Sequence, residues 1–334
     1  MLENRCSLNL YMLCGGTNFG FFNGANASAD EAYAPVTTSY DYLAAIDEAG
    51  RPREKYFAFR DAIARHRRIV PRPVPDLPEV IAVPPCTLDE SAPLDDVLGQ
   101  PVDSKRPLPM ERCNQSFGYI LYRTILPRSG AGLLEIDELR DYATVLLDGE
   151  IFGYLDRRLG QNSIRIDVRK ENATLELLVE NCGRVNYGPL MNGERKGITR
   201  RVRWDGEELL GWQIFSLPFD DLPALHFSRR KRAAPAFHRG LLKLRTAGDT
   251  FLDTGSLGKG FIFINGRNAG RYWRIGPQRS LYIPGTWLRK GTNEIITFDI
   301  TTLDAPTVSG TNDPERPTTA GVYCPRLGAD NQAE

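Results

Sequence analysis

The stretch from Asn9 to Phe59, NLYMLCGGTNFGFFNGANASADEAYAPVTTSYDYLAAIDEAGRPREKYFAF, decides how the chain is organised. At its start the short apolar run Leu8–Leu13, bounded by two glycines, predicts a buried strand. A long loop follows, and from Glu54 onward the apolar residues recur at helical spacing. Strand, loop and helix make one βα unit. In a parallel barrel the loop of such a unit lies at the face where active sites are built.

The composition of this loop suits a sugar ligand. Aromatic faces can cover the C–H side of a sugar ring, while fixed amides and hydroxyls bond its hydroxyl groups. A well-ordered loop with buried tyrosines and hydrogen-bonded asparagines is the alternative interpretation of the same composition. The residues concerned are Tyr11, Phe19, Phe21, Phe22, Tyr33, Tyr40 and Tyr42, with Thr17, Asn18, Asn23, Asn26 and Asp41 among them.

The exact sequence of the loop favours the interpretation as a sugar-binding loop. The patterns NLYMxxGGTNFGFxNGAN and TTSYDYxAxxDEAGxPxEKYFAxR closely resemble the last strand, loop and helix of the barrel in family 35 glycoside hydrolases, the β-galactosidases. The resemblance continues through ENCGRVNYGPLMNGERKGI, LLGWQIFSLPFD and FLDTGSLGKGFIFINGRNAGRYW, which are similar to the β-rich C-terminal portion of that family.

The amino-acid composition of the chain changes after the predicted helix. Between Arg67 and Met110 there are ten prolines, which predict an extended connector, with Glu79–Val83 as a possible strand joining a later sheet. From Phe117 onward short β-branched and aromatic runs alternate with turn residues, a pattern typical of β-sandwiches. We therefore expect a mainly β protein: two tandem jelly-roll sandwiches, resembling galactose-binding-domain-like modules, preceded by the final βα unit of a TIM barrel. The predicted segments are residues 1–68 (barrel unit), 69–110 (connector), 111–209 and 210–305 (sandwiches) and 306–334 (tail).

The two predicted sandwiches look like copies of one another. The segments Val145–Leu155 and Phe261–Trp273 each combine an apolar strand, an Asp-Gly or Asn-Gly turn and a second strand. These dipeptides favour the positive φ angles of a tight hairpin turn.

The resemblance also implies a function. Family 35 enzymes are retaining β-galactosidases, and retention needs two carboxyl groups about 5–5.5 Å apart. In the family these are glutamates on earlier barrel strands, so the resemblance places them upstream of this chain, which begins at what looks like the eighth strand. We therefore assign no catalytic residue here and expect the missing N-terminal barrel portion to be a partner. Tyr11 and Tyr42 match family positions that contact galactose, so the resemblance implies that they bind the β-galactoside substrate.

Carboxylates within the barrel unit are the only local alternative to the missing pair. Asp41 is expected to orient the loop by accepting hydrogen bonds, and Asp47-Glu48 to form a turn before the helix. A catalytic role for either is disfavoured because paired carboxylates normally come from different strand ends. The carboxylates considered are Asp30, Glu31, Asp41, Asp47 and Glu48.

Composition excludes several other classes of function. Lys plus Arg and Asp plus Glu both number 42, so no global field steers the chain to nucleic acid, and the run Arg229–Arg232 is interpreted as a solvated loop. The six cysteines are scattered without a CxxC pair and only three histidines are present, so we do not expect a zinc site. The resemblance to family 35 glycoside hydrolases implies hydrolysis without a metal or an organic cofactor. No apolar run approaches about 18 residues, so no membrane span is predicted, and the compartment stays unassigned.

Three interpretations remain open at this point. The chain is the C-terminal portion of a β-galactosidase, inactive alone; or a non-catalytic carbohydrate-binding or architectural module; or a split reading frame without independent activity. The nucleotide sequence just upstream of Met1 would distinguish these interpretations. A reading frame there that encodes barrel strands and two suitable glutamates would favour the first or the third.

Overall fold

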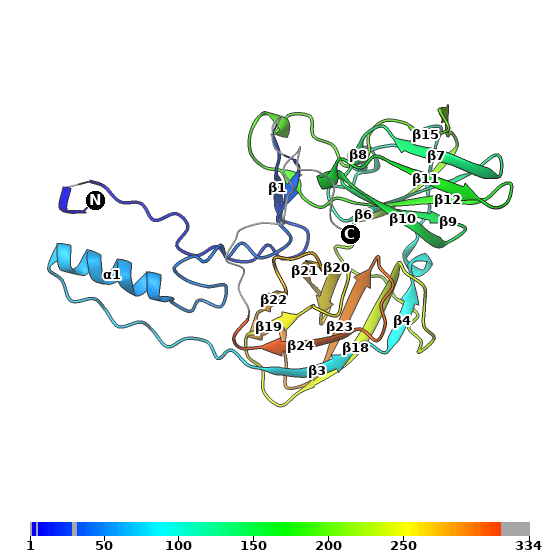
Figure 1. Cartoon of the computed structure of the whole chain (residues 1–334). Coiled ribbons are helices and arrows are strands. Elements are labelled where there is room, and N and C mark those ends of the chain that lie inside the picture. The colour runs from blue at the N-terminus through cyan, green and yellow to red at the C-terminus, as the bar shows by residue number, and fades with distance from the viewer. Residues whose placement is uncertain (1, 5, 29–31, 315–334) are drawn as a thin grey trace.

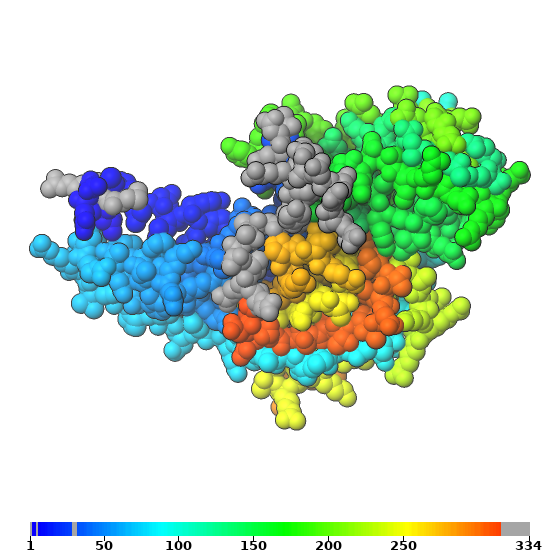
Figure 2. Space-filling view, viewed as in Figure 1, coloured from blue at the N-terminus to red at the C-terminus, as the bar shows by residue number. Residues whose placement is uncertain are grey.

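The computed structural model describes residues 2–4, 6–28 and 32–314. Two β-sandwiches form the bulk of the molecule, and an N-terminal unit extends away from them (Figures 1 and 2). That unit contains the 3₁₀ turn η1 (Leu2–Asn4), two short strands and the helix α1 (Glu54–Arg67). The strands β1 (Gly24–Asn26) and β2 (Ala34–Pro35) form an antiparallel pair. The predicted helix is thus present, and it ends at Arg68 in a left-handed conformation.

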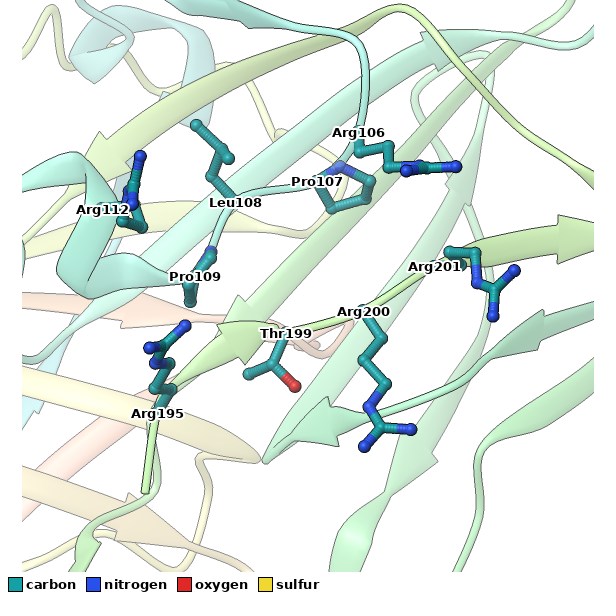
Figure 3. Close-up of a pocket in the computed structure, with 9 residues that line it drawn as sticks. All are labelled: Arg106, Pro107, Leu108, Pro109, Arg112, Arg195, Thr199, Arg200 and Arg201. Carbon is teal, nitrogen blue, oxygen red and sulfur yellow. The ribbon is translucent and has the colours of Figure 1, made fainter. Parts of the chain in front are cut away.

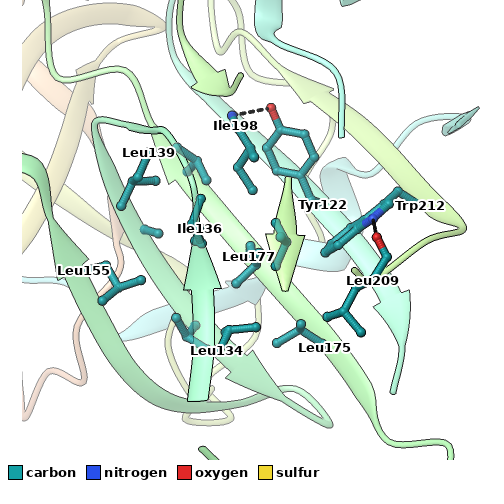
Figure 4. Packing of buried hydrophobic residues seen from close by; sticks show 14 of the residues in the cluster. Tyr122, Leu134, Ile136, Leu139, Leu155, Leu175, Leu177, Ile198, Leu209 and Trp212 are labelled. Atoms are coloured by element: carbon teal, nitrogen blue, oxygen red, sulfur yellow. Dashed lines mark hydrogen bonds between the residues drawn. The ribbon is translucent and has the colours of Figure 1, made fainter. Parts of the chain in front are cut away.

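The first sandwich packs a six-stranded sheet against a four-stranded one. The six strands lie in the order β10-β9-β12-β6-β17-β5, and the four in the order β11-β7-β15-β16. Their bounds are β5 Val102–Ser104, β6 Tyr119–Ile125, β7 Gly130–Ile136, β9 Tyr142–Leu147, β10 Glu150–Asp156, β11 Ser163–Val168, β12 Thr174–Glu180, β15 Val202–Trp204, β16 Glu207–Glu208 and β17 Trp212–Leu217. Alternate residues of these strands, including Tyr122, Leu177 and Trp212, fill the core between the sheets (Figure 4).

The second sandwich repeats this plan. A five-stranded sheet in the order β21-β20-β23-β18-β4 faces a four-stranded sheet in the order β22-β19-β24-β3. Their bounds are β3 Val83–Thr87, β4 Glu90–Pro93, β18 Ala236–Leu244, β19 Thr250–Asp253, β20 Lys259–Ile264, β21 Arg267–Trp273, β22 Ser280–Ile283, β23 Gly291–Asp299 and β24 Thr307–Thr311. A second aliphatic cluster, which includes Leu252, Ile262 and Ile295, fills its interior.

Shorter elements complete the described chain. Two short strands, β8 (Leu139–Arg140) and β14 (Gly197–Ile198), pair with one another, and β13 (Arg184–Val185) pairs with the N-terminal unit. The remaining 3₁₀ turns are η2 Leu94–Val97, η3 Met110–Cys113, η4 Arg157–Leu159, η5 Pro189–Met191 and η6 Gly285–Trp287.

The predicted likeness of the two sandwiches is confirmed at their hairpins. Asp148 and Gly149 join β9 to β10 with φ angles of 50° and 80°, and Asn265 and Gly266 join β20 to β21 with 50° and 78°. Two successive positive φ angles are the signature of a type I′ turn. In both hairpins the pairing register shifts just after the turn, which marks a β-bulge.

A third apolar cluster joins the two sandwiches. The outer face of the six-stranded sheet packs on the outer face of the five-stranded sheet, and aromatic side chains dominate the contact. Phe298 lies 5.3 Å from both Tyr119 and Phe261, measured between ring centroids. Phe21 of the N-terminal unit enters the same cluster and stands edge-on to Phe261. This shared cluster makes one continuous body of the sandwiches and part of the N-terminal unit.

The prediction of a buried strand at Leu8–Leu13 is wrong for this chain. Those residues form no strand, and the nearest ladder contact is a parallel bridge between Cys14 and Ile46. A parallel strand needs neighbours on both edges and cover on both faces, which the described residues do not supply. Leu8 and Leu13 are consequently exposed.

The structure also moves the predicted segment boundaries. The segment predicted to be a connector supplies β3 and β4 to the second sandwich and β5 to the first. The strand expected near Glu79–Val83 begins at Val83, as β3. The first sandwich runs on through β17, beyond residue 209, because β17 pairs with β6. Of the predicted tail, β24 pairs with β19 and β3, while residues 315–334 lie outside the described residues.

Candidate functional site

The two predicted substrate-binding tyrosines both lie on the N-terminal unit. Tyr11 is 87% exposed and forms no hydrogen bond or ring contact with another described residue. Tyr42 is 42% exposed and packs edge-on against Tyr40, with ring centroids 4.4 Å apart. Burial raises the pKa of the Tyr42 phenol above its usual value, so its hydroxyl stays protonated and able to donate. No contact joins Tyr11 directly to Tyr42.

The turn that carries Tyr42 is fixed by Asp41. The carboxylate of Asp41 accepts two hydrogen bonds from the Arg53 guanidinium, at 2.7 and 2.6 Å, and one from the backbone N–H of Leu43. Tyr42 and Leu43 adopt left-handed φ angles of 48° and 53°, which non-glycine residues rarely occupy without such support. The predicted role of Asp41 in orienting the loop is therefore confirmed.

Asp47 forms the turn that precedes α1, as expected. Its carboxylate is buried and accepts hydrogen bonds from the backbone N–H groups of Ala49 and Arg51 and from the Arg51 side chain. These bonds to the next turn of the chain are typical of a structural carboxylate. Asp30 and Glu31, two further carboxylates considered above, lie outside the described residues.

Glu48 differs from the other local carboxylates. Its side chain accepts a hydrogen bond of 2.6 Å from the Thr17 hydroxyl and a second from Ser39, so it joins the two ends of the loop. Burial raises the pKa of Glu48 to about 7, and these hydrogen bonds only partly oppose the shift. The sequence analysis considered Glu48 for its proximity alone. Its distinctive property comes from burial, for which the local sequence carries no signal.

The middle of the loop is docked onto both sandwiches. The Asn23 side chain donates to the carbonyl of Cys182 in the first sandwich and accepts from the guanidinium of Arg271 in the second. Thr38 accepts from the Arg271 backbone N–H and donates to the Arg271 carbonyl. Strand β1 also pairs in parallel with β13, so the loop is joined to the chain that follows β12.

Buried charges line this docked interface. Asp141 contacts Lys196 and Arg157, and it accepts a hydrogen bond from the Tyr33 hydroxyl of the loop. Burial alone would raise the pKa of Asp141, but the two cations outweigh burial and hold the pKa below its usual value. Asp141 therefore stays ionised and helps to bind the loop to its scaffold, so it is not suited to proton transfer.

The tryptophans of the sandwiches serve in packing. Trp212 and Tyr272 are buried in the cores of the first and second sandwich. Trp273 receives the charged ends of Lys259 and Arg158 on its ring. Trp287 packs against Phe19 of the loop, with centroids 4.7 Å apart.

Three segments of the chain match models of known protein families. Residues 1–66 match the model of glycosyl hydrolases family 35, residues 107–218 that of the β-galactosidase first all-beta domain, and residues 235–293 that of the β-galactosidase galactose-binding domain. The chain belongs to glycoside hydrolase family 35. The second match ends at residue 218, one residue beyond β17, which agrees with the boundary in the structure.

Relatives of this family 35 chain carry β-galactosidase names. A β-galactosidase from Xanthomonas manihotis is 44% identical over 286 residues, covering 85% of this chain and 48% of the relative. The human β-galactosidase-1-like protein 2 is 38% identical over 331 residues, covering 94% and 51%. The chain thus spans about half the length of these relatives. A β-galacturonidase from Eisenbergiella tayi matches 68% of this chain and 38% of its own at 13% identity, but its TM-score of 0.24 supports no argument.

Two further findings concern the described residues as a whole. No group of three or more His, Cys, Asp or Glu side chains among them lies together in a way that could hold a metal ion. The described part of the chain also contains no helix long and apolar enough to cross a membrane.

Proposed function

We propose that this family 35 chain forms the C-terminal portion of a retaining β-galactosidase that hydrolyses terminal β-galactosides. In this proposal the N-terminal unit closes a barrel whose other strands bear the two catalytic glutamates. The sandwiches hold that unit in place. The chain alone is then inactive, because the covalent route needs both carboxyl groups together.

The observation that carries the proposal is the division of the loop into a docked and an exposed part. In the middle, Asn23 and Thr38 form hydrogen bonds that fix the described residues of the loop to both sandwiches. The flanking segments carry Tyr11 and Tyr42 and leave the first largely and the second partly exposed. Tyrosines that only packed a core would be buried, so exposed ones beside a firmly anchored loop favour contact with a ligand or a partner.

The exposed apolar residues support a barrel portion as that partner. Helix α1 buries only Ala64, and Figure 1 shows it projecting away from both sandwiches. Large side chains remain exposed along the same unit: Leu8, Leu13, Phe57, Phe59, Ile69 and Val70. A helix and strand segment of a parallel barrel would bury such residues against neighbouring units.

Within the proposed enzyme the tyrosines bind and orient galactose. A phenol places its ring along the C–H face of a sugar and its hydroxyl on a ring or exocyclic oxygen. Tyr42 suits this role because Asp41 and Arg53 fix its backbone while its ring stays accessible. The glutamates supplied by the remaining barrel carry out nucleophilic attack and proton transfer.

The proposal is tested by substituting Tyr42 in an assembled enzyme. The chain is coexpressed with the portion of the Xanthomonas manihotis relative that precedes the matched region, and Tyr42→Phe is compared with Tyr187→Phe. Tyr187 is equally accessible at 79% exposure but lies on the first sandwich. We expect Tyr42→Phe to lower kcat/KM about three- to tenfold, the usual cost of one neutral hydrogen bond, and Tyr187→Phe to change nothing. Equal kinetics for both variants would remove Tyr42 from the site.

A further inference from the structure

A pocket rich in aromatic side chains lies where the docked part of the loop meets both sandwiches. Its volume is about 270 Å³, close to the lower end of the range of ligand pockets, about 300–1,000 Å³. Rings from all three parts of the molecule line this aromatic pocket: Phe19 and Phe22 of the loop, Phe117 of the first sandwich and Trp287 of the second. The pocket therefore exists only because the loop is docked.

Several of these rings are accessible to a ligand. Phe22 is 77% exposed, and Phe117 and Trp287 are partly exposed. Phe21 and Phe219 also line the pocket, but both are buried in the aromatic cluster between the sandwiches. Exposed aromatic surface above a buried aromatic cluster favours a ligand that covers it.

Contacts to both sandwiches hold the walls of the pocket in a fixed relation. The backbone N–H of Gly20 donates to the carbonyl of Asn268, at 3.2 Å, which ties the loop to β21. The ring of Phe22 packs on that of Phe117, with centroids 5.7 Å apart, and the contact of the loop with Trp287 was described above. A preformed pocket loses little conformational entropy on binding.

Two side chains of opposite charge also line the pocket. Asp220 and Arg267 are both exposed, and neither forms a hydrogen bond or an ion pair with another described residue. The Arg267 guanidinium lies 5.6 Å from the centroid of the Trp287 ring. The carboxylate offers acceptors and the guanidinium offers donors, so the pocket can bond both kinds of polar group.

This lining selects a neutral ligand that has hydroxyl groups as well as an apolar face. An anion would be repelled by Asp220, and a cation by Arg267. A wholly apolar ligand would cover both charges without giving them a hydrogen-bond partner, which costs free energy. A sugar ring meets every requirement, because its hydroxyl groups donate and accept while its C–H face packs on aromatic rings.

A larger pocket on the first sandwich has a different character. Its volume is about 620 Å³, and the described residues that line it include five arginines but no aromatic side chain. Figure 3 shows these arginines around Thr199. Without an aromatic face that pocket offers a neutral sugar no ring contact, so the two pockets are suited to different ligands.

We propose that the aromatic pocket binds one hexose unit of a neutral glycan. The sugar places its C–H face on the aromatic rings and bonds its hydroxyl groups to Asp220 and Arg267. The lining residues lie outside the segments that carry Tyr11 and Tyr42, so this site is separate from the proposed galactose site. It needs no catalytic glutamate and does not depend on the proposed hydrolase activity.

The experiment is an NMR titration of the complete 334-residue chain with lactose, a neutral disaccharide. The indole N–H signal of Trp287, assigned by comparison with Trp287→Phe, reports on this pocket. We expect that signal to shift until saturation, and Kd to be about tenfold higher in Asp220→Ala, which loses a hydrogen bond to a charged group. The matched control, Asp221→Ala, removes the neighbouring exposed carboxylate, which does not line the pocket, and should bind like the original chain.

A second pair of variants tests the aromatic face. Phe22→Ala should raise Kd about three- to tenfold, because it removes an accessible ring from the pocket. Its control is Phe57→Ala, which removes an exposed ring on α1 and should leave Kd unchanged. Thermal unfolding of all four variants checks that they are folded.

Two further probes make the assignment specific to a sugar. Cyclohexanol has an apolar ring with a single hydroxyl group, and N-acetylphenylalanine amide represents an aromatic side chain of a protein partner. Both should bind more weakly than lactose. The proposal is overturned if lactose leaves the Trp287 signal in place, if Asp220→Ala and Asp221→Ala bind lactose equally, or if cyclohexanol binds as tightly as lactose. Tighter binding of the phenylalanine amide would assign the pocket to a protein partner instead.

Discussion

The sandwiches and the N-terminal unit differ in how completely they bury their apolar residues. Each sandwich encloses its own aliphatic core, and a third cluster rich in aromatic residues seals the contact between them. In the N-terminal unit residues such as Phe21, Tyr33 and Asp47 are buried, while α1 buries only Ala64, and Leu8 and Leu13 are exposed. The interior of each sandwich is thus filled by its own strands, whereas the N-terminal unit leaves large apolar side chains exposed. Exposed apolar residues beside a loop anchored on the sandwiches are expected if the N-terminal unit packs against the rest of a barrel, as proposed above.

The largest effect is expected from cutting the chain at the boundaries suggested by its sequence. A fragment of residues 111–305 lacks β3, β4, β5 and β24. Val83 and Cys86 of β3 and Val308 of β24 lie in the core of the second sandwich. Each buried apolar side chain contributes about 1.5–3 kcal/mol, against a total of about 5–15 kcal/mol for a domain. We expect this fragment to lack cooperative unfolding in calorimetry, while a fragment of residues 79–314 retains it. Cooperative unfolding of the shorter piece would show that the added strands are dispensable.

A smaller effect is expected from detaching the docked part of the loop. Arg271 contacts Glu180, the Asn181 carbonyl and Asn23, and its substitution by Gln leaves the buried Glu180 with Lys259 as its remaining cation. Breaking a buried ion pair from one side costs about 3–5 kcal/mol. Denaturant unfolding should show that loss, and proteolysis should cut the loop faster.

The control for this change lies on the same strand. Arg267 is exposed at the start of β21, so Arg267→Gln should alter stability by less than about 1 kcal/mol. Equal losses from the two substitutions would contradict a specific role for Arg271 in holding the loop.

A pH-dependent effect is expected in the N-terminal unit. Because the pKa of Glu48 is raised to about 7, the folded unit holds a proton that the unfolded chain releases near its ordinary value of 4.5. Stability from this group is fully present below pH 4.5 and is lost as pH rises to 7, by at most about 3 kcal/mol. Hydrogen exchange of residues 39–53 should therefore show weaker protection at pH 8 than at pH 5.

Glu48→Gln provides the comparison for that measurement. The amide keeps an acceptor for Thr17 but carries no charge, so the pH dependence beyond intrinsic exchange should disappear. A variant that kept the same pH dependence would show that another group titrates in this range.

The parts of this structure that were predictable from sequence depend on local signals. The spacing of apolar residues predicted α1, and the Asp-Gly and Asn-Gly pairs predicted the two hairpins. The family pattern located Tyr11 and Tyr42, and their contact with substrate stays a prediction. Strand β3, VPPCT, escaped recognition because two prolines obscure a strand signal. It occupies a sheet edge, where prolines are tolerated. The linkage of Asn23 to Arg271 joins residues 248 positions apart, and no local pattern can indicate it.

The most direct test of the account is hydrolysis of a chromogenic β-galactoside by the purified chain, alone and coexpressed with the upstream portion of the Xanthomonas manihotis relative. The account predicts no turnover by the chain alone, because general acid–base assistance is worth about 10²–10⁴ in rate and the covalent route needs both carboxyl groups. It predicts that coexpression restores activity. Turnover by the isolated chain would contradict the account, because a carboxylate pair within these 334 residues would then have to be catalytic.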